Sequence, residues 1–319
     1  MRSSLWPRLL AAAAAAVAGV ILACDQTLPT SPSSPTSALP SASPSSGTAA
    51  ATQPGIAEAD VLFAGAGDIA VCGSDSAERT ARLLDRLPGH VFTLGDNVYP
   101  SSTADLLMKC YDPAWGRHRA RTYATPGNHD WEVQAGGPYF AYFGSAAGPA
   151  GKGYYSFTLG AWHVMSLNSN IAAQPGSAQY EWARQDLAGP RAVCTLAMWH
   201  HPVFSSGAYG NNLYMREIWR LLDTAGVELV VTGHEHSYER FAPQTADGRP
   251  DARGLRQFVV GTGGADRRPF AAIQANSEAR NSDTWGILKL LLRASGYEWE
   301  FVPVDGQSFR DQGAAECLE

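Results

Sequence analysis

The sequence predicts a mixed α/β fold, and two observations lead to that prediction. Short apolar runs rich in β-forming residues alternate along the chain with stretches of helical periodicity. The apolar runs are followed by Gly, Asp, Asn or His, so polar side chains collect just past strand ends, where open sheets of this kind bind ligands. Of the 319 residues 45% are hydrophobic and 17% are charged, which is enough apolar surface for a full-sized core.

Four apolar runs predict buried strands, and four further runs predict antiparallel partners. The buried strands are expected at Val61–Gly65, Val91–Leu94, Thr195–Trp199 and Leu229–Thr232. The antiparallel partners are expected at Tyr154–Leu159, His163–Asn168, Ile287–Leu292 and Tyr297–Pro303, with turns at Gly160 and at Ser295-Gly296.

Two helices follow from start and stop signals. Asp75, with Glu78 three residues later, opens a helix predicted over Ser76–Leu87. A second helix is predicted over Leu213–Ala225, because Gly226 ends the helical pattern there.

The N-terminal segment has the order of charge and hydropathy found in secretory signal peptides. Arg2 and Arg8 precede the apolar run Leu9–Ala23, which is too short for a permanent membrane span. Ile21-Leu22-Ala23-Cys24 resembles a bacterial lipoprotein cleavage box, so residues 1–24 are predicted to be a signal peptide and Cys24 a lipid anchor. The alternative is an ordinary Cys24 in a signal cleaved elsewhere. Both interpretations predict export, and the anchor predicts a place on the cell surface or in the periplasm.

A Ser-, Pro-, Thr- and Ala-rich segment follows at residues 25–56. It cannot bury enough apolar surface to offset its ordering entropy, so it is predicted to be a disordered tether. No second linker interrupts residues 57–319, which are therefore predicted to form one domain. The net charge of −6 and the lack of a basic stripe argue against nucleic acid as a partner.

Four cysteines remain besides Cys24: Cys72, Cys110, Cys194 and Cys317. In an oxidising compartment an even number favours disulfides. Four cysteines allow three pairings, and the sequence does not choose among them. The pairing that we prefer joins Cys72 to Cys110 and Cys194 to Cys317.

Five segments place a metal-competent side chain beside a Gly or Pro turn: Gly67-Asp68, Gly95-Asp96-Asn97-Val98-Tyr99, Gly127-Asn128-His129-Asp130, His200-His201-Pro202 and Gly233-His234-Glu235-His236. Singly, each has an ordinary structural explanation as a turn or a hydrogen-bonded residue. Their joint order resembles the ligand motifs of the calcineurin-like metallophosphoesterases, and more narrowly those of the purple acid phosphatases, whose pattern is Asp, Asp-x-x-Tyr, Asn-His, His and His-x-His.

This resemblance extends from about Val61 to Pro303 and implies a fold and a site. The fold is a layered α/β/β/α sandwich of two mixed β-sheets flanked by helices, the metallophosphoesterase fold. The implied site holds two metal ions that share Asp96. The first ion would be bound by Asp68, Asp96, Tyr99 and His236, and the second by Asp96, Asn128, His200 and His234.

The residues after Asp68 point to the subfamily. Many relatives have Asp-x-His here, whereas Asp68-Ile69-Ala70 has no ligand at the third position, and Tyr99 replaces it. A phenolate is a hard anionic donor, which favours Fe(III) in the first site beside divalent Zn, Fe or Mn in the second. His200 is preferred over His201 because it lies two residues before the proline, and His201 is expected to pack or to support a ligand.

The expected chemistry follows from the metal pair. Two cations roughly 3.5 to 4 Å apart can bind phosphate oxygens and convert a bound water into the attacking hydroxide. A trivalent ion acidifies that water further, which predicts an acidic optimum. His129 is expected to be the general acid or to orient the phosphate, with Asn128 as a further substrate-binding residue. Tyr209 occupies a position at which the family often has His, and is expected to donate a hydrogen bond to the substrate.

Three other features each have two explanations. Arg240, in Tyr238-Glu239-Arg240, either touches phosphate or forms a buried salt bridge. Gly261-Thr262-Gly263-Gly264 lacks the Lys of a P-loop, so a tight turn after a strand at Phe258–Val260 is favoured. Four tryptophans are either pocket walls or core residues: Trp131, Trp162, Trp199 and Trp285.

The leading functional prediction is hydrolysis of small phosphomonoesters outside the cytoplasm. The same metal centre could hydrolyse phosphodiesters. A surface binding protein that kept the fold without activity is the third possibility, although the complete ligand set argues against it. Membrane contact is expected only through the lipid anchor at Cys24, and the sequence leaves the oligomeric state and the divalent metal open.

Overall fold

Two mixed β-sheets form the framework of the protein. The computed structural model describes residues 60–189 and 192–318, so the predicted signal peptide, Cys24 and the tether lie outside the described residues. The six-stranded sheet has the order β15-β14-β13-β1-β3-β5, and the seven-stranded sheet has the order β12-β10-β11-β9-β8-β7-β6. A small two-stranded sheet joins β2 to β4.

The strands of the six-stranded sheet are β1 (Val61–Ala66), β3 (His90–Leu94), β5 (Thr122–Thr125), β13 (Gly286–Leu292), β14 (Gly296–Pro303) and β15 (Gln312–Glu316). Those of the seven-stranded sheet are β6 (Tyr155–Leu159), β7 (Trp162–Ser166), β8 (Cys194–Trp199), β9 (Leu229–Thr232), β10 (Tyr238–Phe241), β11 (Arg256–Val260) and β12 (Ser277–Asn281). The small sheet consists of β2 (Ala70–Val71) and β4 (Val98–Tyr99).

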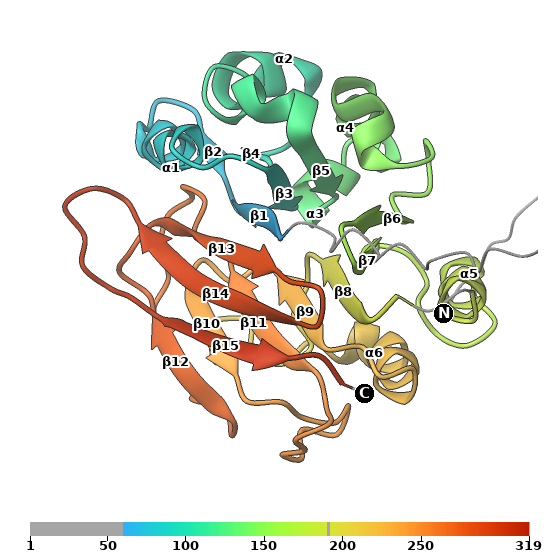
Figure 1. Cartoon of the computed structure of the whole chain (residues 1–319). Helices are drawn as coiled ribbons and strands as arrows, with labels where there is room; N and C mark the ends of the chain where they lie inside the picture. Colours follow the sequence, from blue (N-terminus) through green and yellow to red (C-terminus); the bar gives the residue numbers. More distant parts are fainter. Residues whose placement is uncertain (1–59, 190–191, 319) are drawn as a thin grey trace, which may run out of the picture. The chain divides into compact units, whose positions relative to one another are not determined.

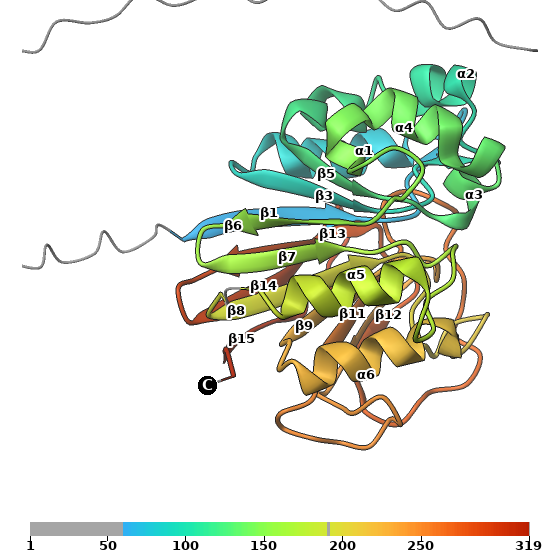
Figure 2. The ribbon, with the colours of Figure 1, turned by 90° about the vertical axis from the view of Figure 1, so that its right-hand side faces the viewer.

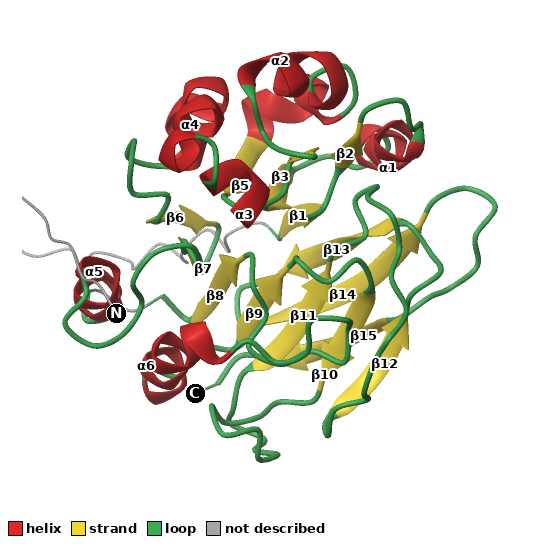
Figure 3. Ribbon diagram, turned by 180° about the vertical axis from the view of Figure 1, so that it is seen from behind, coloured by secondary structure: helices red, strands yellow, loops and turns green. Residues whose placement is uncertain are grey.

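Helices lie on the outer sides of the sheets (Figures 1 and 2). The α-helices are α1 (Ser76–Asp85), α2 (Ala104–Leu106), α3 (Asn128–Trp131), α4 (Gly137–Phe143), α5 (Ala178–Leu187) and α6 (Arg216–Thr224). The other helical segments are η1 (Leu107–Tyr111), η2 (Trp115–Arg121), η3 (Gln134–Gly136), η4 (Gly144–Ala147) and η5 (Leu213–Met215). Helices α1, α2 and α4 cover part of the six-stranded sheet, whereas α5 and α6 cover part of the seven-stranded sheet (Figure 3).

Two hydrophobic clusters hold these layers together. The larger contains Phe63 and Phe92 from one sheet and Leu196 and Val231 from the other, so it fills the space between the sheets. The second joins the seven-stranded sheet to its helices, for example through Trp219 of α6. This arrangement confirms the predicted α/β/β/α sandwich.

Parallel pairing brings the carboxyl ends of the central strands to one edge. In the six-stranded sheet β1 pairs with β3 and β3 with β5, all in parallel. In the other sheet β7, β8, β9 and β11 form a parallel run. The two edges are joined directly, because the amide of Gly67 after β1 donates to the carbonyl of Val260 in β11 at 2.9 Å.

The predicted strands all form, but the helix boundaries differ. Helix α1 ends at Asp85 instead of Leu87, and the Asp75 side chain makes no cap hydrogen bond. The hydroxyl of Ser74 accepts instead from the amide of Ser76, at 3.2 Å. The second predicted helix divides into the 3₁₀ turn η5 followed by α6, and the side chain of Asn212 caps η5 by accepting from the amide of Tyr214.

Strand β7 also differs from its prediction, because it covers Trp162–Ser166 instead of His163–Asn168. Both preferred disulfides are present. Cys72 and Cys110 are 38 positions apart in the sequence, and Cys194 and Cys317 are 123 positions apart. Trp162 and Trp199 are fully buried core residues and not pocket walls.

Within the described ranges the helices are all too short or too polar to cross a membrane.

Candidate metal centre

Three of the predicted ligands adopt a backbone conformation that L-residues avoid. The φ angles are 58° at Asp68, 52° at Asp96 and 71° at His234. Such left-handed residues cost about 1 to 3 kcal/mol each and persist only where the surroundings fix them. Here each follows a parallel strand, and the sharp turn directs its side chain toward the edge where the two sheets meet.

Tyr99 lies at the centre of one group of donors. Its hydroxyl donates to Asp68 Oδ1 at 2.7 Å and lies 2.9 Å from Asp96 Oδ2. His236 Nε2 lies 3.1 Å from the same hydroxyl and 3.3 Å from Asp68 Oδ1. These four side chains are the set predicted for the first metal, and they come from three separate segments of the chain.

His200 lies at the centre of a second group. Its Nε2 atom is 3.3 Å from Asp96 Oδ2, 3.1 Å from Asn128 Oδ1 and 3.2 Å from His234 Nδ1. Asp96 Oδ2 therefore contacts both groups. The structure thus brings together all seven residues predicted as ligands, in two sets that share one carboxylate.

Backbone carbonyls orient two of the imidazoles. His200 Nδ1 donates to the carbonyl of Leu94 at 2.6 Å, and His236 Nδ1 donates to the carbonyl of Asp266 at 2.5 Å. Each bond occupies Nδ1 and leaves Nε2 facing the carboxylates, which is how proteins fix the ligating nitrogen of a histidine.

The electrostatics of the site couple its acids to its imidazoles. Burial raises the pKa of Asp96, but the charge of His200 and the hydrogen bond with it lower the pKa overall. Burial opposes protonation of His200, yet Asp96 raises the pKa of that imidazole to about 9. Burial, with Asp68 and Asp96, raises the pKa of Tyr99 well above its ordinary value. A phenolate at Tyr99 therefore needs a neighbouring cation, and metal binding here would release protons.

His129 and Tyr209, the residues predicted to contact the substrate, both lie beside the donors. His129 is partly exposed, with Nε2 3.9 Å from Asp96 Oδ2 and Nδ1 3.2 Å from Glu132 Oε1. Tyr209 is 57% exposed, and its ring stacks on that of His234 with centroids 4.7 Å apart. Both residues have polar atoms that a bound molecule can reach.

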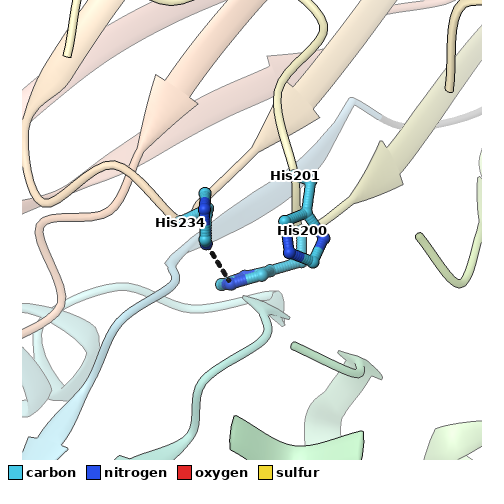
Figure 4. Close-up of side chains that lie close together, drawn as sticks. All are labelled: His200, His201 and His234. Atoms are coloured by element: carbon cyan, nitrogen blue, oxygen red, sulfur yellow. Dashed lines mark hydrogen bonds between the residues drawn. The ribbon is translucent and has the colours of Figure 1, made fainter. Parts of the chain in front are cut away.

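His201 supports the site from behind. Its ring packs at 4.3 Å from the ring of His234, and its Nδ1 atom lies 2.8 Å from the hydroxyl of Ser169. Burial lowers its pKa to about 2, so it stays neutral. Figure 4 shows His201 beside His200 and His234, with the contact between the latter two dashed. The nitrogens of the three rings lie within 4.8 Å of one another, close enough to share a cation.

Asp130 has a role that the sequence motifs alone did not reveal. Its carboxylate accepts from the backbone amides of Asp96 and Gly127 at 2.8 Å each and from that of Asn97 at 3.2 Å. Burial and then the charge of Asp96 raise its pKa to about 6. Asp130 lies in the Gly-Asn-His-Asp segment, and its position two residues after Asn128 is the sequence signal that could have identified it.

Two other predictions are resolved by their neighbours. Arg240 donates to both carboxylate oxygens of Asp311, at 2.8 and 3.1 Å, so it forms a structural salt bridge. The loop Gly261–Gly264 follows β11, and Gly261 is required there because a Cβ would lie 2.0 Å from the carbonyl of Glu235 and 2.7 Å from Asp68 Oδ2. That loop packs against the site and is not a phosphate-binding loop of the P-loop type.

The donor chemistry fits a pair of hard or borderline cations. The two sets contain carboxylate, phenol and amide oxygens together with imidazole nitrogens, and no cysteine. Oxygen and imidazole donors suit iron, zinc and manganese, and a phenolate suits a trivalent ion best. Buried acids this close together also need positive charge nearby.

Comparison with known proteins agrees with this geometry. The chain is 30% identical over 282 residues to purple acid phosphatase 15 of Arabidopsis thaliana, an alignment that covers 75% of this chain and 52% of that protein. It is also 30% identical over 249 residues to an uncharacterised protein of Mycobacterium tuberculosis, covering 63% of this chain and 45% of the other. The chain therefore spans about half the length of these curated relatives.

Solved structures show the same fold. The purple acid phosphatase PPD1 of yellow lupin (Lupinus luteus) superimposes with a TM-score of 0.67 at 19% identity, covering 81% of this chain and 54% of that one. GAP50, described as the anchor in the inner membrane complex of Plasmodium, superimposes with a TM-score of 0.61 at 15% identity, covering 82% and 90%. The family model described as calcineurin-like phosphoesterase matches residues 61–238, which is more than half of the chain and includes every predicted ligand. The chain therefore belongs to the calcineurin-like phosphoesterase family.

Proposed function

We propose that this protein is an exported phosphoesterase that uses two metal ions to hydrolyse phosphomonoesters, with an optimum at acidic pH. The observation that carries the proposal is the convergence of seven donor side chains in two sets that share Asp96. The purple acid phosphatases among its relatives support the same activity.

The proposed ligands of the first ion are Asp68, Asp96, Tyr99 and His236, and those of the second are Asp96, Asn128, His200 and His234. Fe(III) is proposed in the first position because of Tyr99, and a divalent Zn, Fe or Mn ion in the second. When bound, such a pair would polarise the phosphoryl group and lower the pKa of the attacking water.

The remaining residues handle the substrate. His129 is partly exposed beside Asp96, so its imidazole can hydrogen-bond the phosphate or donate a proton to the leaving oxygen. Asn128 adds a polar group at the start of helix α3. Tyr209 supplies a hydroxyl at the exposed edge of the site.

Export and anchoring are part of the proposal. They rest on the charged and then apolar order of residues 1–24 and on the Cys24 box. Mass spectrometry of the mature N-terminus tests them: a lipid-modified Cys24 supports the anchor, whereas an unmodified terminus elsewhere favours the simpler signal peptide.

A hydrolysis assay tests the activity. It compares a chromogenic phosphomonoester with its diester analogue from acid to alkaline pH, with iron and zinc present. Faster monoester turnover with an acid optimum supports the proposal, and diester preference would make the protein a phosphodiesterase. GAP50 of Plasmodium shares this fold and is described as an anchor, so the fold alone does not imply catalysis. Substoichiometric metal content and no turnover would therefore favour a binding protein.

A further inference from the structure

Arg268 lies at the edge of the metal centre, in the loop that follows Gly261–Gly264. Its backbone amide donates to the carbonyl of His236 at 3.3 Å. Its guanidinium contacts the hydroxyl of Tyr209 and lies 5.0 Å from the centroid of that ring. Because the same ring stacks on His234, Arg268 is one side chain removed from a predicted ligand.

Arg268 differs in its charge pairing from many other arginines of the described chain. Within residues 60–189 and 192–318, no acidic oxygen forms a salt bridge with it, although many arginines in that range have such partners. The site therefore has a cation at its edge that remains available to an anion.

The neighbouring Arg267 has a different position and serves as a comparison. Its guanidinium lies 4.4 Å from the centroid of Trp285 and contacts the carbonyl of Asp283. Of these two adjacent arginines, Arg268 contacts Tyr209 beside the site, whereas Arg267 packs on Trp285.

Hydrogen bonds fix the two loops that carry Arg268 and Tyr209. The amide of Ala271 donates to the carbonyl of Ser206, and the amide of Gln274 donates to its hydroxyl, both at 2.9 Å. The amide of Tyr209 donates to Glu235 Oε1 at 2.8 Å, and Glu235 lies between the two histidines of the His-x-His segment. The backbone of the loops that carry Arg268 and Tyr209 is therefore held close to the predicted ligands.

We propose that Arg268, supported by Tyr209, binds the substrate phosphate and makes the site selective for phosphomonoesters over phosphodiesters above a pH of about 6, where the monoester carries its second charge. This inference rests on the proposed function. A guanidinium has planar paired donors that match two phosphate oxygens. A monoester carries a charge of about −1.5 to −2 at pH 7 because its second pKa is about 6. A diester carries a single charge and has one oxygen fewer to offer.

Three variants test the proposal at pH 7: Arg268→Ala, Arg268→Lys and the matched control Arg267→Ala. The Arg268→Ala variant should lose about 10- to 100-fold in kcat/KM for a nitrophenyl phosphomonoester, as expected for a charge-assisted hydrogen bond. Its kcat/KM for the corresponding diester should change by less than about threefold. Arg268→Lys keeps the charge without the paired donors and should lose less, and Arg267→Ala should match the wild type.

The pH dependence provides a second readout. Below a pH of about 6 the monoester becomes singly charged, so the loss caused by Arg268→Ala should shrink as the pH falls. A loss that is the same for monoester and diester at every pH would overturn the proposed selectivity, since it would indicate general damage to the site.

Calorimetric titration with inorganic phosphate, with metal content measured in each sample, separates this inference from the proposed function. Phosphate should bind about tenfold more weakly to Arg268→Ala than to the wild type or Arg267→Ala. If the wild type hydrolyses neither ester, the proposed function fails, while the phosphate titration still tests Arg268. If the wild type prefers monoesters and Arg268→Ala retains both that preference and the phosphate affinity, this inference alone is wrong.

Discussion

At the scale of single residues, three predicted ligands have strained backbone conformations, and neighbouring groups hold them in place. Asp68, Asp96 and His234 have positive φ angles, and backbone hydrogen bonds hold the turns, as between the amide of Asp68 and the carbonyl of Gly95 at 3.0 Å. Gly127 must be glycine because a Cβ there would lie 2.1 Å from Asp96 Oδ1. The shared carboxylate of Asp96 is thus placed by its surroundings rather than by local preference.

Asp130 contributes to this placement, because its carboxylate accepts from the backbone amides around Asp96. An Asp130→Asn variant replaces one acceptor oxygen with an NH₂ group, which faces either the backbone amides of Asp96 and Gly127 or, in the other orientation, that of Asn97. We expect metal affinity to fall about 10- to 100-fold, as is typical for groups that orient ligands. Metal titration followed by elemental analysis measures the change.

The control for this variant is Asp105→Asn, which removes an exposed carboxylate that pairs with Lys109. It should bind metal like the wild type. Unchanged metal affinity in Asp130→Asn would show that the turns hold their geometry without this carboxylate.

His129 is predicted to donate a proton or hydrogen bond to the substrate. His129→Ala should therefore reduce turnover on esters with poor leaving groups more than on esters with good ones, because only the former need protonation. Rates for a series of aryl and alkyl phosphates, plotted against leaving-group pKa, measure the difference. Equal loss across the series would argue against a proton-donor role.

At the scale of elements, contacts between distant strands determine which charged residues are structural. Just before β15, Asp311 accepts from Arg240 of β10, from the hydroxyl of Tyr238 at 2.6 Å and from the indole of Trp299 in β14 at 3.2 Å. These bonds tie the six-stranded sheet to the seven-stranded one. The first of the two disulfides similarly ties Cys72, which follows β2, to η1, close to the strand that carries Tyr99.

The bonds of Asp311 predict how stability changes with pH. Burial raises the pKa of Asp311, but hydrogen bonds from Arg240 and then Tyr238 lower it overall. The folded pKa therefore lies below the unfolded value of about 3.9, so the stabilisation is present above that pH and is lost as the pH falls through the folded pKa.

Asp311→Asn should lower the free energy of unfolding by about 2 kcal/mol at neutral pH. The difference from the wild type should shrink below a pH of about 4. Urea denaturation at both pH values measures it, and Asp305→Asn is the control because Asp305 pairs with Arg86 on the exposed surface. A difference that persists unchanged in acid would show that packing rather than charge holds this contact.

At the scale of the whole fold, the site lies where two sheets meet, and each sheet supplies ligands. Asp68, Asp96 and Asn128 follow strands of the six-stranded sheet, and His200 and His234 follow strands of the seven-stranded sheet. Cations bound by both groups would therefore link the two sheets. Metal binding should stabilise the fold as well as the site.

Removal of metal should accordingly lower the melting temperature. With metal at about a thousand times its dissociation constant, the linkage amounts to about 4 kcal/mol, or roughly 10 °C for a protein of this size. Differential scanning calorimetry with and without a chelator measures the shift, and adding metal back should reverse it. In Asp96→Ala the chelator should have little effect, and a wild type that melts at the same temperature with and without chelator would contradict the prediction.

The sequence predicted the parts of this protein that depend on local pattern. Apolar runs such as Val61–Gly65 and Leu229–Thr232 identify buried strands because burial requires such runs wherever the strand ends up. The order of the five motifs was enough to suggest the family, and the residues it named do come together.

Other features depend on contacts between residues far apart in the chain, which no local pattern encodes. Arg240 meets Asp311, Cys194 meets Cys317, and Arg268 meets Tyr209 only because the sheets and loops pack as they do. The sequence by itself therefore determined the fold class and the candidate ligands, whereas the tertiary structure decided which charged residues stabilise the sheets and which face the site, since a charge is paired or unpaired only in three dimensions.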